Sequence, residues 1–181
     1  MKRILLFSAL ALLIASCNSG NGKKASGPSH TKVIETSIEN VDSLNNVIPS
    51  TWKNLKTIVE GVAHTGNIAS KIDSVNRFSL VYEARLGDID EAMPTEIKFT
   101  TYGCALQPDS KAILVVSVNG EKFYKGVTLD TLFTNVNEWK QMNFTFTLPD
   151  NLKKDDIMKA YVWNNGIGEL LVDDFKLEIA Y

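Results

Sequence analysis

The sequence is poor in the residues that build metal centres and nucleophilic active sites. Among 181 residues there are two cysteines, Cys17 and Cys104, and two histidines, His30 and His64. Zinc motifs need several Cys or His ligands at close spacing, so this pattern argues against a zinc site. No nucleophile elbow, phosphate-binding loop or dinucleotide fingerprint occurs either. The sequence therefore predicts a protein that is not an enzyme.

An excess of basic residues is also missing. Removal of residues 1–16 as a leader takes Lys2 and Arg3 from the 19 basic side chains and none from the 21 acidic ones, which leaves a net charge of −4. Proteins that bind nucleic acid carry a basic surface that neutralises phosphates. The charge balance therefore excludes nucleic acid as an expected partner.

The longest apolar run is too short to cross a bilayer. Ile4–Ile14 follows a positive pair of residues and spans roughly a dozen positions, whereas a transmembrane helix needs about 20. A run of this length behind a basic pair is typical of a secretory signal peptide. Ile14-Ala15-Ser16-Cys17 resembles a bacterial lipobox, in which the cysteine thiol is joined to diacylglycerol. We expect lipidation of Cys17, the alternative being an ordinary signal peptide that ends near a cysteine.

These features divide the chain into three parts. Residues 1–16 form the expected signal peptide, residues 17–31 the lipidated cysteine and a flexible tether rich in Gly, Ser, Asn and Lys, and residues 32–181 a single domain. In bacterial lipoproteins an Asp after the cysteine favours retention at the inner membrane. Asn18 therefore favours the outer membrane, on its periplasmic or its surface-exposed side.

From residue 32 onward the pattern favours β-strands over helices. Val, Ile, Phe, Tyr and Thr gather in short segments between turn residues, and Met142, Phe144, Phe146 and Leu148 alternate with polar neighbours, as in a strand with one buried face. Cys104 lies within such a segment, and we expect it to be buried. The expected strands are 32–39, 55–60, 67–73, 78–87, 95–104, 111–119, 121–126, 138–148, 157–164 and 169–180.

Turn signals complete the pattern. Asn119-Gly120 predicts a type I′ hairpin, while 42–54 and 150–156 have room for one helical turn each. Many short strands without helical periodicity indicate an all-β protein, an antiparallel β-sandwich or jelly roll.

Three segments of the chain resemble a known family. They are AHTGN at 63–67, NEWKQMNFTFTLP at 137–149, and YVWNNGIGELLVDDFKLEI at 161–179. Their order and spacing are similar to those of galactose-binding-like jelly rolls, which include many carbohydrate-binding modules, such as those of Bacteroidota lipoproteins. The likeness covers roughly residues 55–181. It implies a non-catalytic domain that binds a glycan.

The last segment also raises a question of charge. Simple alternation places Asp173 on the same face as Phe175, Leu177 and Ile179, and a buried carboxylate needs a cation or several donors. In the family, an acid at this place often ligates a structural calcium together with an N-terminal glutamate and the early glycine turn. The resemblance therefore implies a calcium site. Its ligands would be Asp173, Glu39, Gly66 and Asn67, with Glu60 competing for the place of Glu39. The alternative is a carboxylate capped by backbone amides or a hydroxyl.

A sugar site needs a flat ring for stacking and polar groups that bond the hydroxyls of the sugar. Trp163, Asn164 and Asn165 supply both kinds of group, and Tyr102 and Tyr124 are further candidates. The alternative for each aromatic residue is packing in the core. We therefore expect a membrane-anchored lipoprotein that binds a glycan. The rival functions are a module that binds a surface-protein partner and, less favoured, a small hydrolase.

Overall fold

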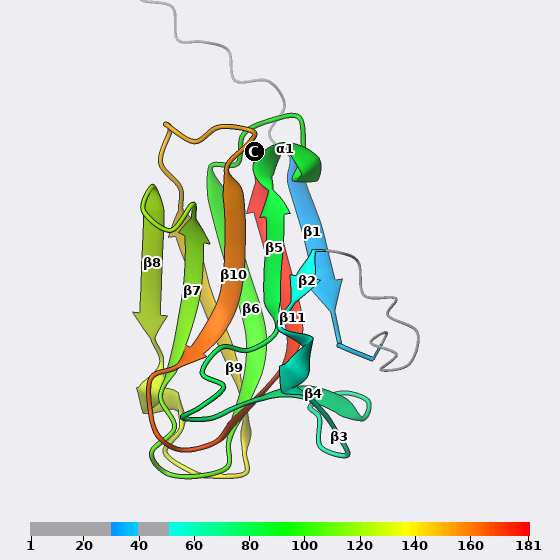
Figure 1. Ribbon diagram of the computed structural model, residues 1–181, viewed down its shortest axis with the longest axis vertical. Coiled ribbons are helices and arrows are strands. Elements are labelled where there is room, and N and C mark those ends of the chain that lie inside the picture. Colours follow the sequence, from blue (N-terminus) through cyan, green and yellow to red (C-terminus); the bar gives the residue numbers. More distant parts are fainter. Residues whose placement is uncertain (1–29, 40–50) are drawn as a thin grey trace, which may run out of the picture.

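The computed structural model describes residues 30–39 and 51–181 and shows two antiparallel sheets packed face to face (Figure 1). One sheet has the order β3 (Ile58–Glu60), β4 (Ile68–Ile72), β11 (Leu170–Ala180), β6 (Glu96–Ala105) and β9 (Trp139–Thr147), and β1 (Thr31–Thr36) also pairs with β11. The other has the order β2 (Trp52–Lys53), β5 (Val81–Arg85), β10 (Ile157–Asn164), β7 (Ala112–Val118) and β8 (Phe123–Thr128). The predicted antiparallel β-sandwich is confirmed.

Helical structure is slight in the described ranges. It consists of α1 (Leu86–Ile89) and the 3₁₀ turns Leu55–Thr57 and Asp130–Leu132. None of the helices in these ranges is long and apolar enough to cross a membrane. A helical turn was also expected within residues 150–156 and within residues 42–54. Residues 150–156 form turns without a helix, and most of residues 42–54 lie outside the described residues.

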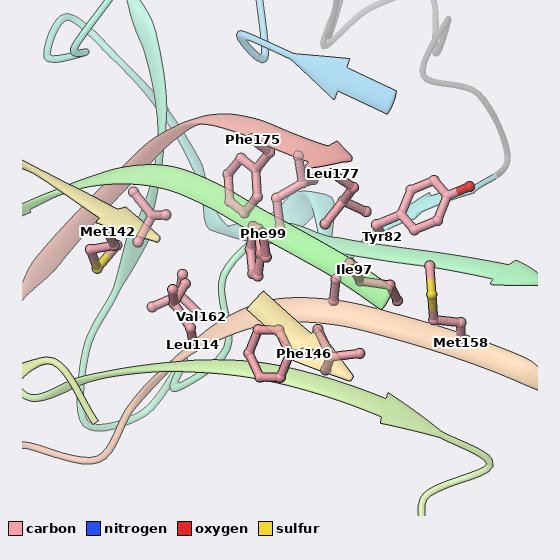
Figure 2. Close-up of a cluster of buried hydrophobic side chains, with 14 of the residues drawn as sticks. Tyr82, Ile97, Phe99, Leu114, Met142, Phe146, Met158, Val162, Phe175 and Leu177 are labelled. Atoms are coloured by element: carbon pink, nitrogen blue, oxygen red, sulfur yellow. The ribbon is translucent and has the colours of Figure 1, made fainter. Parts of the chain in front are cut away.

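The core fills the space between the two sheets. Phe99, Phe175 and Leu177 from the six-stranded sheet point toward Leu114 and Val162 from the five-stranded sheet (Figure 2). All five side chains are buried, and burial of each such side chain stabilises the fold by about 1.5–3 kcal/mol. The alternation of β9 is confirmed as well, since its apolar positions face this core and the polar ones between them are exposed.

A smaller apolar cluster lies on the outer side of the six-stranded sheet. Cys104 packs there with Ala69 and Leu171, and Trp139 borders the cluster. Cys104 is buried, as expected, and burial raises the pKa of its thiol. A protonated, enclosed thiol is a packing residue rather than a nucleophile.

The hairpin between β7 and β8 differs from the prediction. Asn119 and Gly120 have φ values of 49° and 66°, as a type I′ turn requires, but Val118 pairs with Phe123, so the loop has four residues and β8 begins later than expected. The reason lies in the Asn119 side chain, which donates to Asp156 and accepts from the Ile157 amide. The loop is shaped by its contact with the start of β10.

Asp156 is the centre of this contact. Its carboxylate accepts hydrogen bonds from the Lys122 ammonium at 2.7 Å, the Asn119 amide at 2.7 Å and the Lys153 backbone N–H at 2.7 Å. The Lys122 hydrogen bond, followed by these other donors, lowers the pKa of Asp156. The carboxylate therefore ties the β7–β8 hairpin to the loop before β10.

We predict that Asp156→Ala lowers the melting temperature at neutral pH, because three donors lose their acceptor. A lowered folded-state pKa means that the stabilisation is complete above the unfolded value of about 3.9 and is lost as pH falls through the folded value. The difference in melting temperature from the parent should therefore shrink in acid. Calorimetry over a pH series measures it. Asp155→Ala, an exposed neighbour, is the control, and an equal loss in both variants would contradict the prediction.

Candidate functional site

The outer face of the five-stranded sheet carries a group of aromatic side chains. In β10, Met158, Ala160 and Val162 point into the core, so Tyr161 and Trp163 point outward. This outward parity is dictated by the core, because a slip of one residue would bury the aromatic rings and expose the aliphatic ones.

Phe78 joins this group from the segment before β5. It forms an isolated bridge to Trp163, and its ring lies edge-on to Tyr161 with centroids 5.6 Å apart and 6.3 Å from that of Trp163. The Asn54 amide donates to the carbonyls of Phe78 and Ser79 and thereby fixes this segment. Phe78 remains 46% exposed, so a large apolar ring faces solvent at a defined place.

Tyr124 extends the group across the sheet. It stands on β8, is 53% exposed, and its hydroxyl lies over Gly126, where an added Cβ would be 3.9 Å away. Burial raises the pKa of Tyr161 to about 12, and the charge and hydrogen bond of Tyr124 add to the rise. Tyr124 on β8 and Tyr161 on β10 flank β7 on the outer side of the sheet. We call Phe78, Tyr124, Tyr161 and Trp163 the aromatic face.

A hollow of about 290 Å³ opens beside the aromatic face. Its polar rim includes the Asn54 amide and an ion pair between Lys159 and Glu83, with 2.9 Å between ammonium and carboxylate. The residues that line it are Lys53, Asn54, Phe78, Val81, Glu83, Lys159 and Tyr161. Flat rings thus stand next to groups that donate and accept hydrogen bonds.

The five residues expected to bind a ligand do not form one site. Trp163 and Tyr124 lie on the aromatic face, but Tyr102 stands on β6 in the opposite sheet. Asn165 is exposed in the loop after β10. Asn164 is fully buried: its carbonyl accepts from the Lys111 and Gly166 amides, and its NH₂ donates to the Gly168 carbonyl. Asn164 shapes the loop and offers nothing to a ligand, which corrects that expectation.

Two residues of the aromatic face were missing from the expected site. Tyr161 shares the parity of Trp163, so the alternation along β10 could have identified it. Phe78 carried no comparable signal, because it precedes β5 and reaches Trp163 only through the pairing of distant segments.

The expected position of Asp173 is wrong. A β-bulge interrupts the pairing of β11 with β6 between Asp173 and Lys176, and Asp174 adopts a left-handed φ of 51°. Before the bulge Leu170 and Val172 face the core, and after it Phe175 does. Asp173 therefore points to the outer side of the sheet, where it is nevertheless fully buried.

Asp173 and Glu39 both bind the turn at residues 63–68. Asp173 accepts from the His64 and Thr65 amides at 2.9 and 3.1 Å, and Glu39 accepts from the Asn67 and Ile68 amides at 2.7 and 2.8 Å. Burial raises the pKa of Asp173, while its amide hydrogen bonds oppose that rise. Two of the residues that the resemblance selected, Asp173 and Glu39, thus meet at one turn, where they accept hydrogen bonds from backbone amides.

The donor set at this turn does not fit calcium. Calcium takes six to eight oxygen ligands, whereas both carboxylates here face N–H groups. A Cβ on Gly66, whose φ is 67°, would lie 2.3 Å from the Glu39 carboxyl carbon, so the glycine lets the carboxylate approach the backbone. In the described residues no group of three or more His, Cys, Asp or Glu side chains could hold a metal ion. Calcium at this turn stays a prediction.

Comparison with known proteins identifies the type of fold. No protein-family model matches the chain, and no curated protein sequence matches it. The CBM22-2 xylan-binding domain of Paenibacillus barcinonensis Xyn10C matches with a TM-score of 0.54 and 13% identity, over 81% of this chain and 98% of that one. The CBM22-1 domain of the same protein matches with a TM-score of 0.52 and 12% identity, over 84% and 97%.

A third structure contains more than this type of domain. The CBM22-1–GH10 modules of Clostridium thermocellum xylanase 10B, complexed with xylohexaose, match with a TM-score of 0.51 and 15% identity over 71% of this chain. The chain spans only 26% of that xylanase chain. These likenesses show the fold: the chain is an antiparallel β-sandwich similar to that of these carbohydrate-binding modules. The resemblance in fold that was inferred from the sequence is confirmed, and the Bacteroidota lipoprotein context stays a prediction.

Proposed function

We propose that the domain is a non-catalytic module that binds a glycan through the aromatic face. The observation that carries this proposal is the outward cluster of Phe78, Tyr161 and Trp163 beside a polar-rimmed hollow. Phe78 is 46% exposed and packs against two further outward rings, so the exposed apolar surface is contiguous. The fold supports the proposal, since its structural neighbours with TM-scores above 0.5 include xylan-binding domains.

The chemistry of this face suits a pyranose. The C–H face of a sugar ring stacks on an aromatic ring through apolar contact, and its equatorial hydroxyls then point sideways to polar groups. Phe78 and Tyr161 stand nearly perpendicular at 88°, so together they make a corner rather than a flat platform. Asn54 and the Glu83–Lys159 pair supply donors and acceptors within the same hollow.

The hollow also argues for binding without hydrolysis. Glycosidases place two carboxyl groups on either side of the scissile bond. Glu83 is the single carboxylate in the lining of this hollow, and Lys159 is paired with it at 2.9 Å. A carboxylate held in an ion pair accepts hydrogen bonds from hydroxyls, as a recognition site requires.

We further propose that lipid on Cys17 anchors this domain to the outer membrane. The tether from the cysteine to residue 31 has a reach of roughly 50 Å, at about 3.5 Å for each residue. β1 enters the sandwich beside the C-terminus, where the Tyr181 amide donates to the His30 carbonyl at 3.0 Å. Trp163 lies at the other end of the sandwich, because the loop after it leads into β11, which runs the length of the sheet back to Tyr181 (Figure 1). This orientation turns the Trp163 end of the aromatic face away from the membrane.

We predict that the full chain binds soluble β-linked oligosaccharides on a glycan array that includes xylohexaose. Phe78→Ala and Trp163→Ala should each weaken binding at least about tenfold, or about 1.4 kcal/mol, because each removes a stacking surface. Val75 lies in the loop before Phe78, and its side chain is 85% exposed. Val75→Ala is therefore the matched control and should bind glycans like the parent. Titration calorimetry gives the affinities. Absence of binding to every glycan would favour a protein-interaction module instead.

The anchor has its own test. We predict that a bacterial host given an alkyne-labelled fatty acid incorporates the label into the parent chain, and that Cys17→Ser abolishes incorporation, because the thiol is the point of attachment. Cys104→Ser should keep the label. Equal labelling of the parent and Cys17→Ser would disprove the anchor without bearing on glycan binding.

A further inference from the structure

A second hollow lies on the opposite sheet, over the bulge in β11. It has a volume of about 680 Å³, larger than the one beside the aromatic face. Its walls come from the end of β1, the turn before β4, the middle of β6 and β9, and the bulge itself. None of the strongly exposed large apolar side chains of the described residues lines it. Polar side chains make up most of its lining, and the rings of Tyr102 and Phe175 are its apolar parts.

The groove is built around one fixed imidazole. His64 stacks on the Tyr102 ring with centroids 3.7 Å apart and planes 12° apart. The Trp139 ring lies edge-on to His64, with 5.5 Å between the two centroids. Its Nδ1 lies 2.6 Å from the Asp174 carboxylate, whose other oxygen accepts from the Thr65 hydroxyl at 2.6 Å. In the neutral imidazole that carries its proton on Nδ1, Nδ1–H donates to Asp174 and Nε2 is an acceptor.

The backbone at Asp174 is strained where its carboxylate meets His64. A left-handed φ of 51° in a residue other than glycine is uncommon, and such residues gather at binding and catalytic sites. A regular strand would not bring Asp174 to His64, because the bulge is what turns it outward. The bulge thus lets Val172 and Phe175 both pack into the core and at the same time brings the Asp174 carboxylate to His64.

Hydroxyl groups dominate the rest of the lining. They belong to Thr36, Ser37, Thr65, Thr100 and Tyr102. The Gln141 amide donates to the Tyr102 hydroxyl at 3.1 Å and is itself exposed. The lining has two carboxylates, Glu35 and Asp174, and one ammonium, Lys176, and the Asp174 carboxylate is already bonded to His64 and Thr65. Such a lining matches a neutral ligand that is rich in hydroxyls better than a phosphate or an apolar peptide.

We propose that this groove is a second saccharide-binding site, with the Tyr102–His64 pair and Gln141 at its centre. The proposal rests on the proposed function, because it assigns the same ligand class to a second face. Two sites on opposite sheets let one anchored domain hold two glycan chains, or two parts of one chain. Simultaneous occupancy would raise the effective strength of capture without any increase in the affinity of either site.

The two sites can be observed separately in the full chain. Trp139 borders the groove and Trp163 belongs to the aromatic face, so their indole N–H signals in ¹⁵N NMR report on one site each, while Trp52, buried in the core, is an internal reference. Xylohexaose, cellohexaose and mannohexaose are titrated one at a time. We expect at least one of them to shift both the Trp139 and the Trp163 signals.

Variants test whether the groove acts on its own. Gln141→Ala should weaken the response of Trp139 about tenfold or more and leave that of Trp163 unchanged. Asn143→Ala, the next outward residue of β9 and also exposed, is the control and should alter neither. Phe78→Ala should weaken the response of Trp163 and leave that of Trp139 intact.

Each other outcome is decisive. If the Trp163 signal shifts and the Trp139 signal stays still for all three sugars, the second site is disproved and the proposed function stands. If the Trp139 response disappears in Phe78→Ala, it was transmitted from the aromatic face, and the second site is again disproved. If neither signal shifts, both proposals fail together.

Discussion

The register of β10 is the constraint on which the rest of the account depends. This strand lies in the middle of the five-stranded sheet, and Met158, Ala160 and Val162 fix its inner face against the core. Because side chains alternate with a period of two, the same packing holds Tyr161 and Trp163 outward. No further interaction is therefore needed to hold the aromatic face at the surface. It is the far side of a strand whose near side stabilises the fold.

In the opposite sheet, the side chains of one strand have to change the face on which they alternate. Its central strand, β11, must bury Val172 on one side of the bulge and Phe175 on the other, and strict alternation cannot do both. The extra residue, Asp174, corrects the phase and projects outward. Its carboxylate then orients His64, while neighbouring Asp173 fastens the backbone of the same turn. A change of phase in the core thus generates the polar groove on the surface.

The sequence predicted what depends on local periodicity and missed what depends on distant pairing. Every expected strand overlaps an observed one, because residues such as Met142 and Phe146 alternate with polar neighbours. The two-residue strand at Trp52 was missed, since it is too short for any period and is defined only by its pairing with β5. The bulge at Asp174 was missed as well, because Asp173, Phe175, Leu177 and Ile179 alternate along the sequence as they would in a regular strand. Tyr102 and Trp163 were grouped together although they lie on opposite sheets, since sheet membership follows from topology.

The most direct test of the central claim is a crystal structure of the full chain grown with xylohexaose. The account predicts a pyranose ring in van der Waals contact with Phe78 or Trp163, its hydroxyls bonded within the hollow that Asn54 and Glu83 border. A sugar in the groove over Tyr102 as well would be consistent with it. A structure in which the aromatic face stays bare while the oligosaccharide binds elsewhere would contradict the claim that β10 presents the ligand-binding surface.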